Sequence, residues 1–291
     1  MDAVEAPEII RSAPFAFRGF HALYFLPMPN IEKHQPGSFC WIELATSDQS
    51  AAKNFYGTLF GWSFRESRMG PGDFYTIFQR QERDVAAGYT LREEERKQGI
   101  PSHWMLYIAV ESADATAQRV EPLGGKLLVP PFDVASYGKM AVVQDPTGPV
   151  ISIWEPRENR GTGIAGVGGT FCWADLSSPD PIRAAKFYRE LFGWKMKTDN
   201  DDDPASGYQH IQNGEQFIGG ILPAPKDSKI PPHWLSYFLV TNCDLSAAKA
   251  KELGAGFLLP PTTVPNVGRM AVVVDPQQAV FALFQPAPRE Q

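Results

Sequence analysis

The two halves of this 291-residue sequence repeat one another. The segment from Phe39 to Trp62 returns 132 positions later as Phe171 to Trp194, and 12 of the 24 aligned residues are identical. Unrelated segments of this length would share about one or two residues by chance. Two shorter blocks return in the same order, HWMLY as HWLSY and GKMAVVQDP as GRMAVVVDP. The repeat predicts two domains of one fold, built on the residues that the halves share.

The repeat also sets the predicted domain boundaries. Residues 1–36 stand outside it, 37–156 form the first domain, 157–169 are a glycine-rich linker, and 170–291 form the second domain. The N-terminal extension contains an aromatic and proline-rich run, PFAFRGFHALYFLPMP. We expect this run to pack as a strap across the body of the protein or against a partner subunit, which leaves a homodimer open.

Composition excludes several classes of partner. The net charge of -6 gives no support to a nucleic acid or an anionic membrane as partner. No apolar run approaches the roughly 18 residues that a membrane-spanning helix needs. The start MDAVEAPE is acidic, unlike a secretory signal, so we expect a cytoplasmic protein. Three cysteines do not suggest a disulfide framework.

The hydrophobic pattern predicts the same order of elements twice in each half. In the first half, alternation over 39–45 predicts a strand, Asp48 an N-cap, and the spacing from Ala51 to Phe60 a helix that Gly61 ends. Three strands should follow, and then a second strand, helix and three strands. This order excludes a doubly wound parallel sheet. It predicts an α+β fold of four βαβββ modules, with cupped mixed sheets, outer helices and an open concave face for a small ligand.

These modules resemble a known superfamily. The paired βαβββ pattern, the helices AAKNFYGTLFGW and AAKFYRELFGW, and the DPTG turn before the last strand are similar to the vicinal oxygen chelate superfamily. It includes glyoxalase I, extradiol dioxygenases and bleomycin-resistance proteins. The resemblance covers Gly37 to Pro286 and implies two domains with the glyoxalase/dihydroxybiphenyl-dioxygenase fold. Two such domains in one chain look like a group that includes a mycobacterial culture-filtrate antigen and is labelled glyoxalase-like or hydroxylase-like.

The resemblance also implies where a metal would bind. Superfamily enzymes hold a divalent metal with His, Gln or Glu side chains from three strand positions. None of the residues at these positions is a good ligand for such a metal, and we therefore predict a protein without a metal cofactor. The positions are Trp41, Met105 and Ser152 in the first half, and Trp173, Leu235 and Ala282 in the second.

A shift of two residues along each strand keeps a side chain on the same face and changes the candidates. It brings in Glu43 with His103, or Asp175 with His233. A three-ligand site would still lack its third member, because Glu155 and Gln285 fall on the opposite face of the last strand. A partial site is the most that this register supports.

Strand parity predicts which side chains line each cup. Cys40, Ile42 and Leu44 are expected beneath the helix, so their neighbours face the cup. The two predicted linings have the same character, an aromatic wall with one acid, one tyrosine and a histidine at the rim. The first comprises Phe39, Trp41, Glu43, His103, Met105, Tyr107, Ser152 and Trp154; the second comprises Phe171, Trp173, Asp175, His233, Leu235, Tyr237, Ala282 and Phe284.

Such a lining suits a small aromatic or hydrophobic compound. Glu43 and Asp175 are candidate general bases, because burial raises the pKa of a carboxylate, and Tyr107 and Tyr237 could donate to a developing oxyanion. Two alternatives stay open. The protein could be a metal-dependent glyoxalase-like lyase or dioxygenase, or a non-catalytic interaction protein whose acids and tyrosines bond to one another inside filled barrels.

Overall fold

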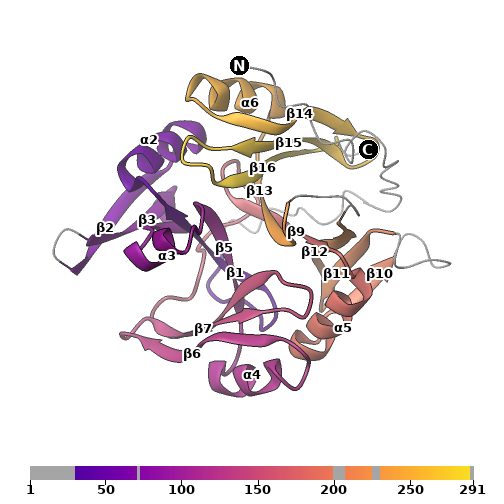
Figure 1. Cartoon of the computed structure of the whole chain (residues 1–291). Helices are drawn as coiled ribbons and strands as arrows, with labels where there is room; N and C mark the ends of the chain where they lie inside the picture. Colours follow the sequence, from indigo (N-terminus) through magenta and orange to yellow (C-terminus); the bar gives the residue numbers. More distant parts are fainter. Residues whose placement is uncertain (1–29, 71–72, 199–206, 225–229, 289–291) are drawn as a thin grey trace.

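The computed structural model describes residues 30–70, 73–198, 207–224 and 230–288. The aromatic and proline-rich run that was predicted to form a strap ends at residue 29 and therefore lies outside the described residues. Each half forms one eight-stranded sheet (Figure 1). None of the helices in the described ranges is long and apolar enough to span a membrane.

The first sheet has the strand order β2-β3-β4-β1-β5-β8-β7-β6, and β1 pairs in parallel with β4 but antiparallel with β5. The elements of this half are β1 (Phe39–Thr46), α2 (Gln49–Phe60), β2 (Ser63–Gly70), β3 (Asp73–Arg80), β4 (Arg83–Thr90), α3 (Glu93–Lys97), β5 (His103–Ala109), α4 (Ala113–Val120), β6 (Lys126–Val134), β7 (Gly138–Gln144) and β8 (Val150–Pro156).

The second sheet repeats this topology with the order β10-β11-β12-β9-β13-β16-β15-β14. Its elements are β9 (Phe171–Ser178), α5 (Pro181–Phe192), β10 (Lys195–Thr198), β11 (Gln209–Asn213), β12 (Gln216–Pro223), β13 (His233–Leu239), α6 (Cys243–Glu252), β14 (Gly256–Val264), β15 (Gly268–Val274) and β16 (Val280–Pro286). The predicted α+β fold with four βαβββ modules and mixed sheets is confirmed. The short helix α3 was not predicted.

The repeated FGW segment ends a helix and ties the halves together. Asp48 accepts from the backbone N–H of Ala51 and caps α2, as predicted. Gly61 ends this helix in the left-handed region at φ 68°. The indole of Trp62 then donates to the carbonyl of Gly169, just before the first strand of the other half. Trp194 donates in the same way to Gly37, so each half anchors the start of the other.

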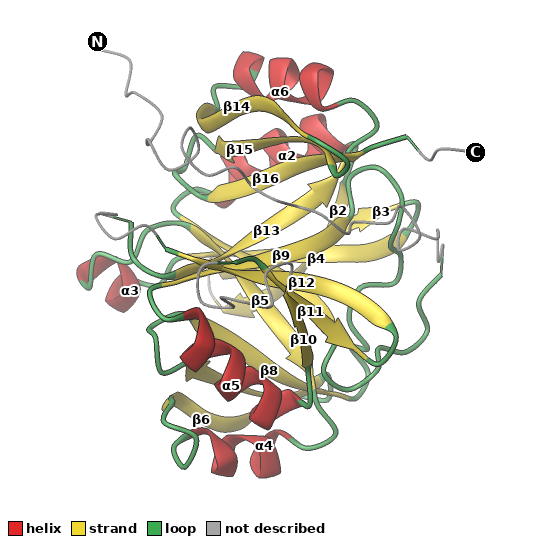
Figure 2. Ribbon diagram, turned by 90° about the vertical axis from the view of Figure 1, so that its right-hand side faces the viewer, coloured by secondary structure: helices red, strands yellow, loops and turns green. Residues whose placement is uncertain are grey.

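The two halves share one core. Helix α2 lies beside α6, and α4 beside α5, so helices from different halves pair above and below the sheets (Figures 1 and 2). Between them the rings of Phe60 and Phe238 stack at 5.0 Å. The Tyr56 hydroxyl, which accepts from Trp104, donates to Asp275 of the other half at 2.8 Å. This shared apolar core leaves the opposite, concave face of each sheet available for a site.

A β-bulge changes the parity at the start of the first strand in each half. The register shifts between Phe39 and Trp41, and in the second half between the partners Tyr237 and Phe238. Phe39 therefore does not face a cup. It packs in the shared core, with its ring 5.7 Å from that of Phe171.

The prediction that Phe39 and Phe171 line the cups is therefore wrong, and so is the placement of Cys40 beneath the helix. Cys40 packs with the residues of the first cup, and Cys172 with those of the second. Alternation carries no sign of a bulge, because a bulge adds one residue that the period of two does not count.

Candidate functional site

A cavity of about 1620 Å³ occupies the concave face of the first sheet. It exceeds the roughly 300–1,000 Å³ of ordinary small-molecule sites. Strands β1, β3, β5, β7 and β8 supply its floor and walls, since alternate residues of each strand face the same way. Seven residues expected in the first cup line it: Trp41, Glu43, His103, Met105, Tyr107, Ser152 and Trp154.

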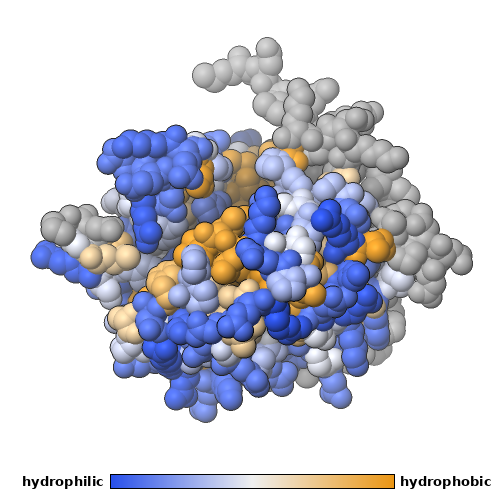
Figure 3. Space-filling model, turned by 60° about the horizontal axis from the view of Figure 1, so that its bottom comes forward, coloured by the Kyte–Doolittle hydropathy of each residue, from blue (hydrophilic) through white to orange (hydrophobic). Residues whose placement is uncertain are grey.

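The lining of this cavity includes exposed apolar side chains beside charged ones. Five large side chains at the rim are exposed, namely Met69, Leu128, Val129, Phe132 and Tyr137. Apolar side chains gather in a hollow between polar ones on the face of the molecule that Figure 3 shows. Exposed apolar surface that borders a cavity is typical of a binding site for an organic ligand.

One carboxylate lies on the floor of the first cup. Oε2 of Glu43 accepts a hydrogen bond of 2.6 Å from the Tyr107 hydroxyl. The Trp41 indole donates to the Tyr75 hydroxyl at 3.3 Å. Burial raises the pKa of Glu43, while Tyr107, Tyr75 and the charge of Arg92 oppose that rise. A carboxyl group with a raised pKa beside a cavity can exchange a proton with a bound molecule.

A second polar group on this floor has no partner. Ser152 is fully buried and lines the cavity, and its hydroxyl makes no hydrogen bond within the described part of the chain. Its strand neighbours are Tyr107 on β5 and Val142 on β7. Tyr107 already donates its proton to Glu43. Among the described residues the Ser152 hydroxyl is therefore a covered polar group without a hydrogen-bond partner.

The two predicted rim histidines both lie beside this one cavity. Nδ1 of His103 is 2.9 Å from the Pro101 carbonyl, and Nδ1 of His233 is 2.8 Å from that of Pro231. Because a carbonyl only accepts, these contacts place the proton on Nδ1 in each ring. His233 was expected at the mouth of the second cup, but it lines the first cavity together with Pro232 and Trp234. The second half therefore contributes to the edge of the first site.

The second cup holds its acid in a closed set of hydrogen bonds. Oδ1 of Asp175 accepts from Trp173 at 3.0 Å and from Tyr208 at 2.5 Å, and Oδ2 accepts from Tyr237 at 2.7 Å. Burial raises the pKa of Asp175 to about 6 against the opposing effect of these donors. Leu235, Ala282 and Phe284 complete this cluster, as expected for the second cup.

Sequence reasoning missed a third residue of each polar floor. Tyr75 on β3 and Tyr208 next to β11 occupy equivalent positions, 133 residues apart, and both serve as acceptors for the first-strand tryptophan. The repeated tyrosine was visible in the sequence. It was missed because the offset between the halves changes from 132 to 133 residues there, and because the sequence analysis did not predict which side chains of β3 face the cup. Residues 159–161 of the linker, which also line the first cavity, carry no such signal.

The residues at the superfamily's metal positions do not fit a divalent metal. The positions expected in the first half were Trp41, Met105 and Ser152, but Met105 pairs with Glu43, and the residue of β5 level with Trp41 and Ser152 is Tyr107. None of the four residues at the predicted and observed positions offers a carboxylate or an imidazole, since they are a tryptophan, a methionine, a tyrosine and a serine. Within the described ranges, no group of three or more His, Cys, Asp or Glu side chains could hold a metal ion in either cup.

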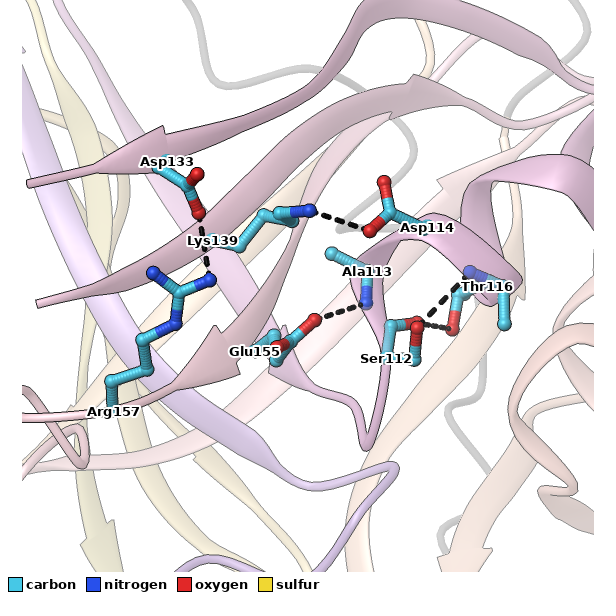
Figure 4. Close-up of polar contacts among 9 residues, drawn as sticks. Ser112, Ala113, Asp114, Thr116, Asp133, Lys139, Glu155 and Arg157 are labelled. Atoms are coloured by element: carbon cyan, nitrogen blue, oxygen red, sulfur yellow. Dashed lines mark hydrogen bonds and ion pairs between the residues drawn. The ribbon is translucent and has the colours of Figure 1, made fainter. Parts of the chain in front are cut away.

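The carboxylate near the end of β8 has another role. Glu155 accepts from the backbone N–H of Ala113 at the start of α4, while Lys139 pairs with Asp114 (Figure 4). Gln285 accepts in the same way from Cys243 at the start of α6. These side chains satisfy helix N-termini outside the cups, in agreement with the parity predicted for them.

The paired βαβββ modules and cupped sheets define a class of protein, and comparison with known families names it. The chain belongs to the Glyoxalase/Bleomycin resistance protein/Dioxygenase superfamily, whose model matches residues 38–153 and 171–283.

Several relatives cover nearly the whole chain. "Putative glyoxylase CFP32" of Mycobacterium tuberculosis is 35% identical over 90% of this chain and 100% of its own length. "Anthracycline biosynthesis protein DnrV" of Streptomyces peucetius is 31% identical over 88% of this chain and 95% of its own. Among solved structures, the Mn(II)-bound glyoxalase of Novosphingobium aromaticivorans superposes with a TM-score of 0.60 and 17% identity, over 86% of this chain and 82% of that one. That likeness shows the fold alone.

Proposed function

We propose that the first cup binds a flat aromatic compound and that Glu43 exchanges a proton with it, without a metal. The observation that carries the proposal is the cavity of about 1620 Å³ with this partly buried carboxyl group on its floor. Trp41 and Trp154 offer ring faces on its walls, and Met105 and Met140 adapt to irregular shapes.

The acid–base step needs only groups of this chain. A ligand hydroxyl, or an acidic C–H beside a carbonyl, would give its proton to the Glu43 carboxylate. The Tyr107 hydroxyl, held at 2.6 Å from Glu43, would stay positioned to donate to the oxygen that gains charge. Glu43 would return the proton when the product forms, so the protein ends the cycle unchanged.

A fluorescent anthracycline aglycone is a suitable first probe. It is flat and aromatic, and the 31% identical relatives are named for anthracycline biosynthesis. We expect the purified protein to quench its fluorescence with saturation. Trp41→Ala should weaken binding about tenfold or more, because stacking on an aromatic wall contributes about 1–3 kcal/mol. The matched variant Trp173→Ala should leave the affinity unchanged. Weakening by Trp173→Ala alone would contradict the placement in the first cup.

Elemental analysis of the purified protein tests the absence of a metal. The donor set of both cups favours a protein that retains no stoichiometric divalent metal after dialysis. Stoichiometric manganese, iron, nickel or zinc that survives dialysis, and that Glu43→Gln or His103→Ala releases, would favour the metal-dependent alternative.

A further inference from the structure

One small residue beside each floor acid differs between the cups. Ala87 pairs with Glu43 across the first sheet, and Gly220 pairs with Asp175 across the second. We infer that the side chain at this position decides whether a cup is open to a ligand, because it sets how closely the neighbouring tyrosine covers the acid. Only the part of the inference that concerns ligand affinity rests on the proposed function.

In the second cup the tyrosine lies directly on the bare backbone of Gly220. A Cβ atom built on this glycine would lie 1.9 Å from both the ring carbon Cζ and the hydroxyl oxygen of Tyr208. Carbon atoms in contact lie about 3.5–4.0 Å apart, so any side chain here would displace the tyrosine. From its place over the glycine, the Tyr208 hydroxyl donates to Asp175 at 2.5 Å and accepts from Trp173 at 2.9 Å.

The first cup has a methyl group in the same place. Ala87 is fully buried in the cluster that contains Trp41, and Tyr75 packs against this cluster. Tyr75 is the equivalent of Tyr208, but the methyl group occupies the space that Tyr208 fills over its glycine. Tyr75 is half-buried and lines the cavity, whereas Tyr208 is buried. The first-strand indole also lies farther from it, at 3.3 Å instead of 2.9 Å.

The accessibility of each acid follows the position of its tyrosine. Asp175 is buried beneath Tyr208 and the other donors, while Glu43 is partly exposed and lines the cavity. Tyr75 still interacts with Glu43, whose pKa it lowers against the effect of burial, but it leaves the carboxylate within reach of the cavity. The two acids also differ by one methylene group. The tests below therefore leave both acids unchanged and vary only the small residue and the tyrosine.

The first test uses the second half and needs no ligand. Tyr208→Phe should lower the thermal midpoint by about 3 °C in the otherwise wild-type protein, because Asp175 loses a donor. In Gly220→Ala, where the tyrosine is already displaced, the same substitution should lower the midpoint by less than about 1 °C. The comparison within each background cancels the general effect of the alanine on the strand. Equal shifts in the two backgrounds would overturn the inference.

The second test closes the first cup. Ala87→Gly should weaken binding of the anthracycline aglycone about fivefold, because Tyr75 can then settle over Glu43 and the ligand must displace one hydrogen bond. In a Tyr75→Phe background the same substitution should leave the affinity unchanged, since phenylalanine has no hydroxyl to bond to the carboxylate.

Ala109→Gly is the matched control, because Ala109 is another buried alanine of the same cluster. It should leave the affinity at the wild-type value. Weakening by Ala87→Gly that persists in the Tyr75→Phe background, or that Ala109→Gly reproduces, would overturn the inference while leaving the proposed function standing. Failure of the wild-type protein to bind the aglycone would overturn the proposed function, and the unfolding of the Gly220→Ala proteins would still decide the inference.

Discussion

The two cups have the same arrangement of residues on the floor and differ in how many hydrogen bonds the polar groups there make. Each has a tryptophan on the first strand, a carboxylate two residues later, one tyrosine on the adjacent antiparallel strand and a second tyrosine on or just before the strand two places away on the other side. In the second cup both oxygens of Asp175 accept hydrogen bonds at 3.0 Å or less. In the first, the hydrogen bond found for Glu43 among the described residues reaches Oε2 alone, and the Ser152 hydroxyl has none.

The difference teaches how a duplicated fold can divide its roles. The carboxylate of Asp175 accepts hydrogen bonds from Trp173, Tyr208 and Tyr237, so the polar groups on the floor of the second cup stabilise one another. Glu43 is partly exposed and lies beside a cavity, so a ligand can hydrogen-bond to its carboxylate. The first cup is therefore suited to binding, while the polar floor of the second is suited to stability.

The largest expected effect comes from removing the two acids in turn. Asp175→Ala should lower the free energy of unfolding by about 3 kcal/mol, because the buried hydroxyls of Tyr208 and Tyr237 lose their acceptor, while the Trp173 indole keeps Tyr208. Glu43→Ala should cost about 1 kcal/mol, since Tyr107 and Tyr75, which both interact with this carboxylate, lie beside a cavity where water can replace it. Urea unfolding followed by tryptophan fluorescence measures both values. Equal losses would break the comparison between the cups.

The pH dependence of stability tests the same acid without removing it. Burial raises the pKa of Asp175 from 3.8 to about 6, so between these pH values the folded protein holds a proton that the unfolded chain has released. The free energy of unfolding should therefore fall as pH rises through this window, by up to about 3 kcal/mol at 1.36 kcal/mol per pKa unit.

Asp175→Asn isolates this contribution, because the variant's curve of unfolding free energy against pH lacks the titration of the Asp175 carboxyl group. The difference between the wild-type and variant curves should slope between pH 4 and 6 and be flat above. A difference curve without slope in that window would show that Asp175 is not held in a desolvated site.

The contacts between the halves extend the comparison to the shared core. Tyr56→Phe should cost about 2 kcal/mol, because its hydroxyl joins Trp104 to Asp275 and both lose a partner when it goes. Tyr188→Phe should cost a similar amount, since Trp234 donates to Tyr188 and Tyr188 interacts with the Asp145 carboxylate, whose pKa it lowers against the effect of burial. Thermal unfolding measures both variants, and a loss in only one of them would contradict the equivalence of the two contacts.

The smallest expected effects lie at the helix starts. Glu155→Ala should cost about 1 kcal/mol and Gln285→Ala about half of that, because a charged acceptor also interacts with the helix dipole. Both variants should keep wild-type ligand affinity, as these side chains lie outside the cups. A loss of affinity in Glu155→Ala would bring this carboxylate back as a candidate for the site.

Much of the fold could be predicted because it depends on short-range patterns. Asp48, the apolar spacing from Ala51 to Phe60 and Gly61 define a helix with both ends, and the repeat supplies the same pattern a second time. The inner faces of β1, β5 and β8 followed from alternation, but the register did not, since Met105 was expected level with Trp41 and Ser152 where the structure has Tyr107. The failures lay where alternation is interrupted, as at the bulge that turns Phe39 into the shared core.

The sequence by itself determined the duplication, the modules and the absence of good metal ligands at the superfamily's positions, because each is a matter of residue identity at a fixed spacing. Only the tertiary structure decided that the cups differ. Whether a buried hydroxyl or carboxylate finds a partner depends on distances between strands far apart in the chain. Asp175 accepts three hydrogen bonds, whereas its counterpart Glu43 accepts one by the same geometric criteria among the described residues. The repeat aligns these two acids, so the difference depends on how the side chains around each of them pack.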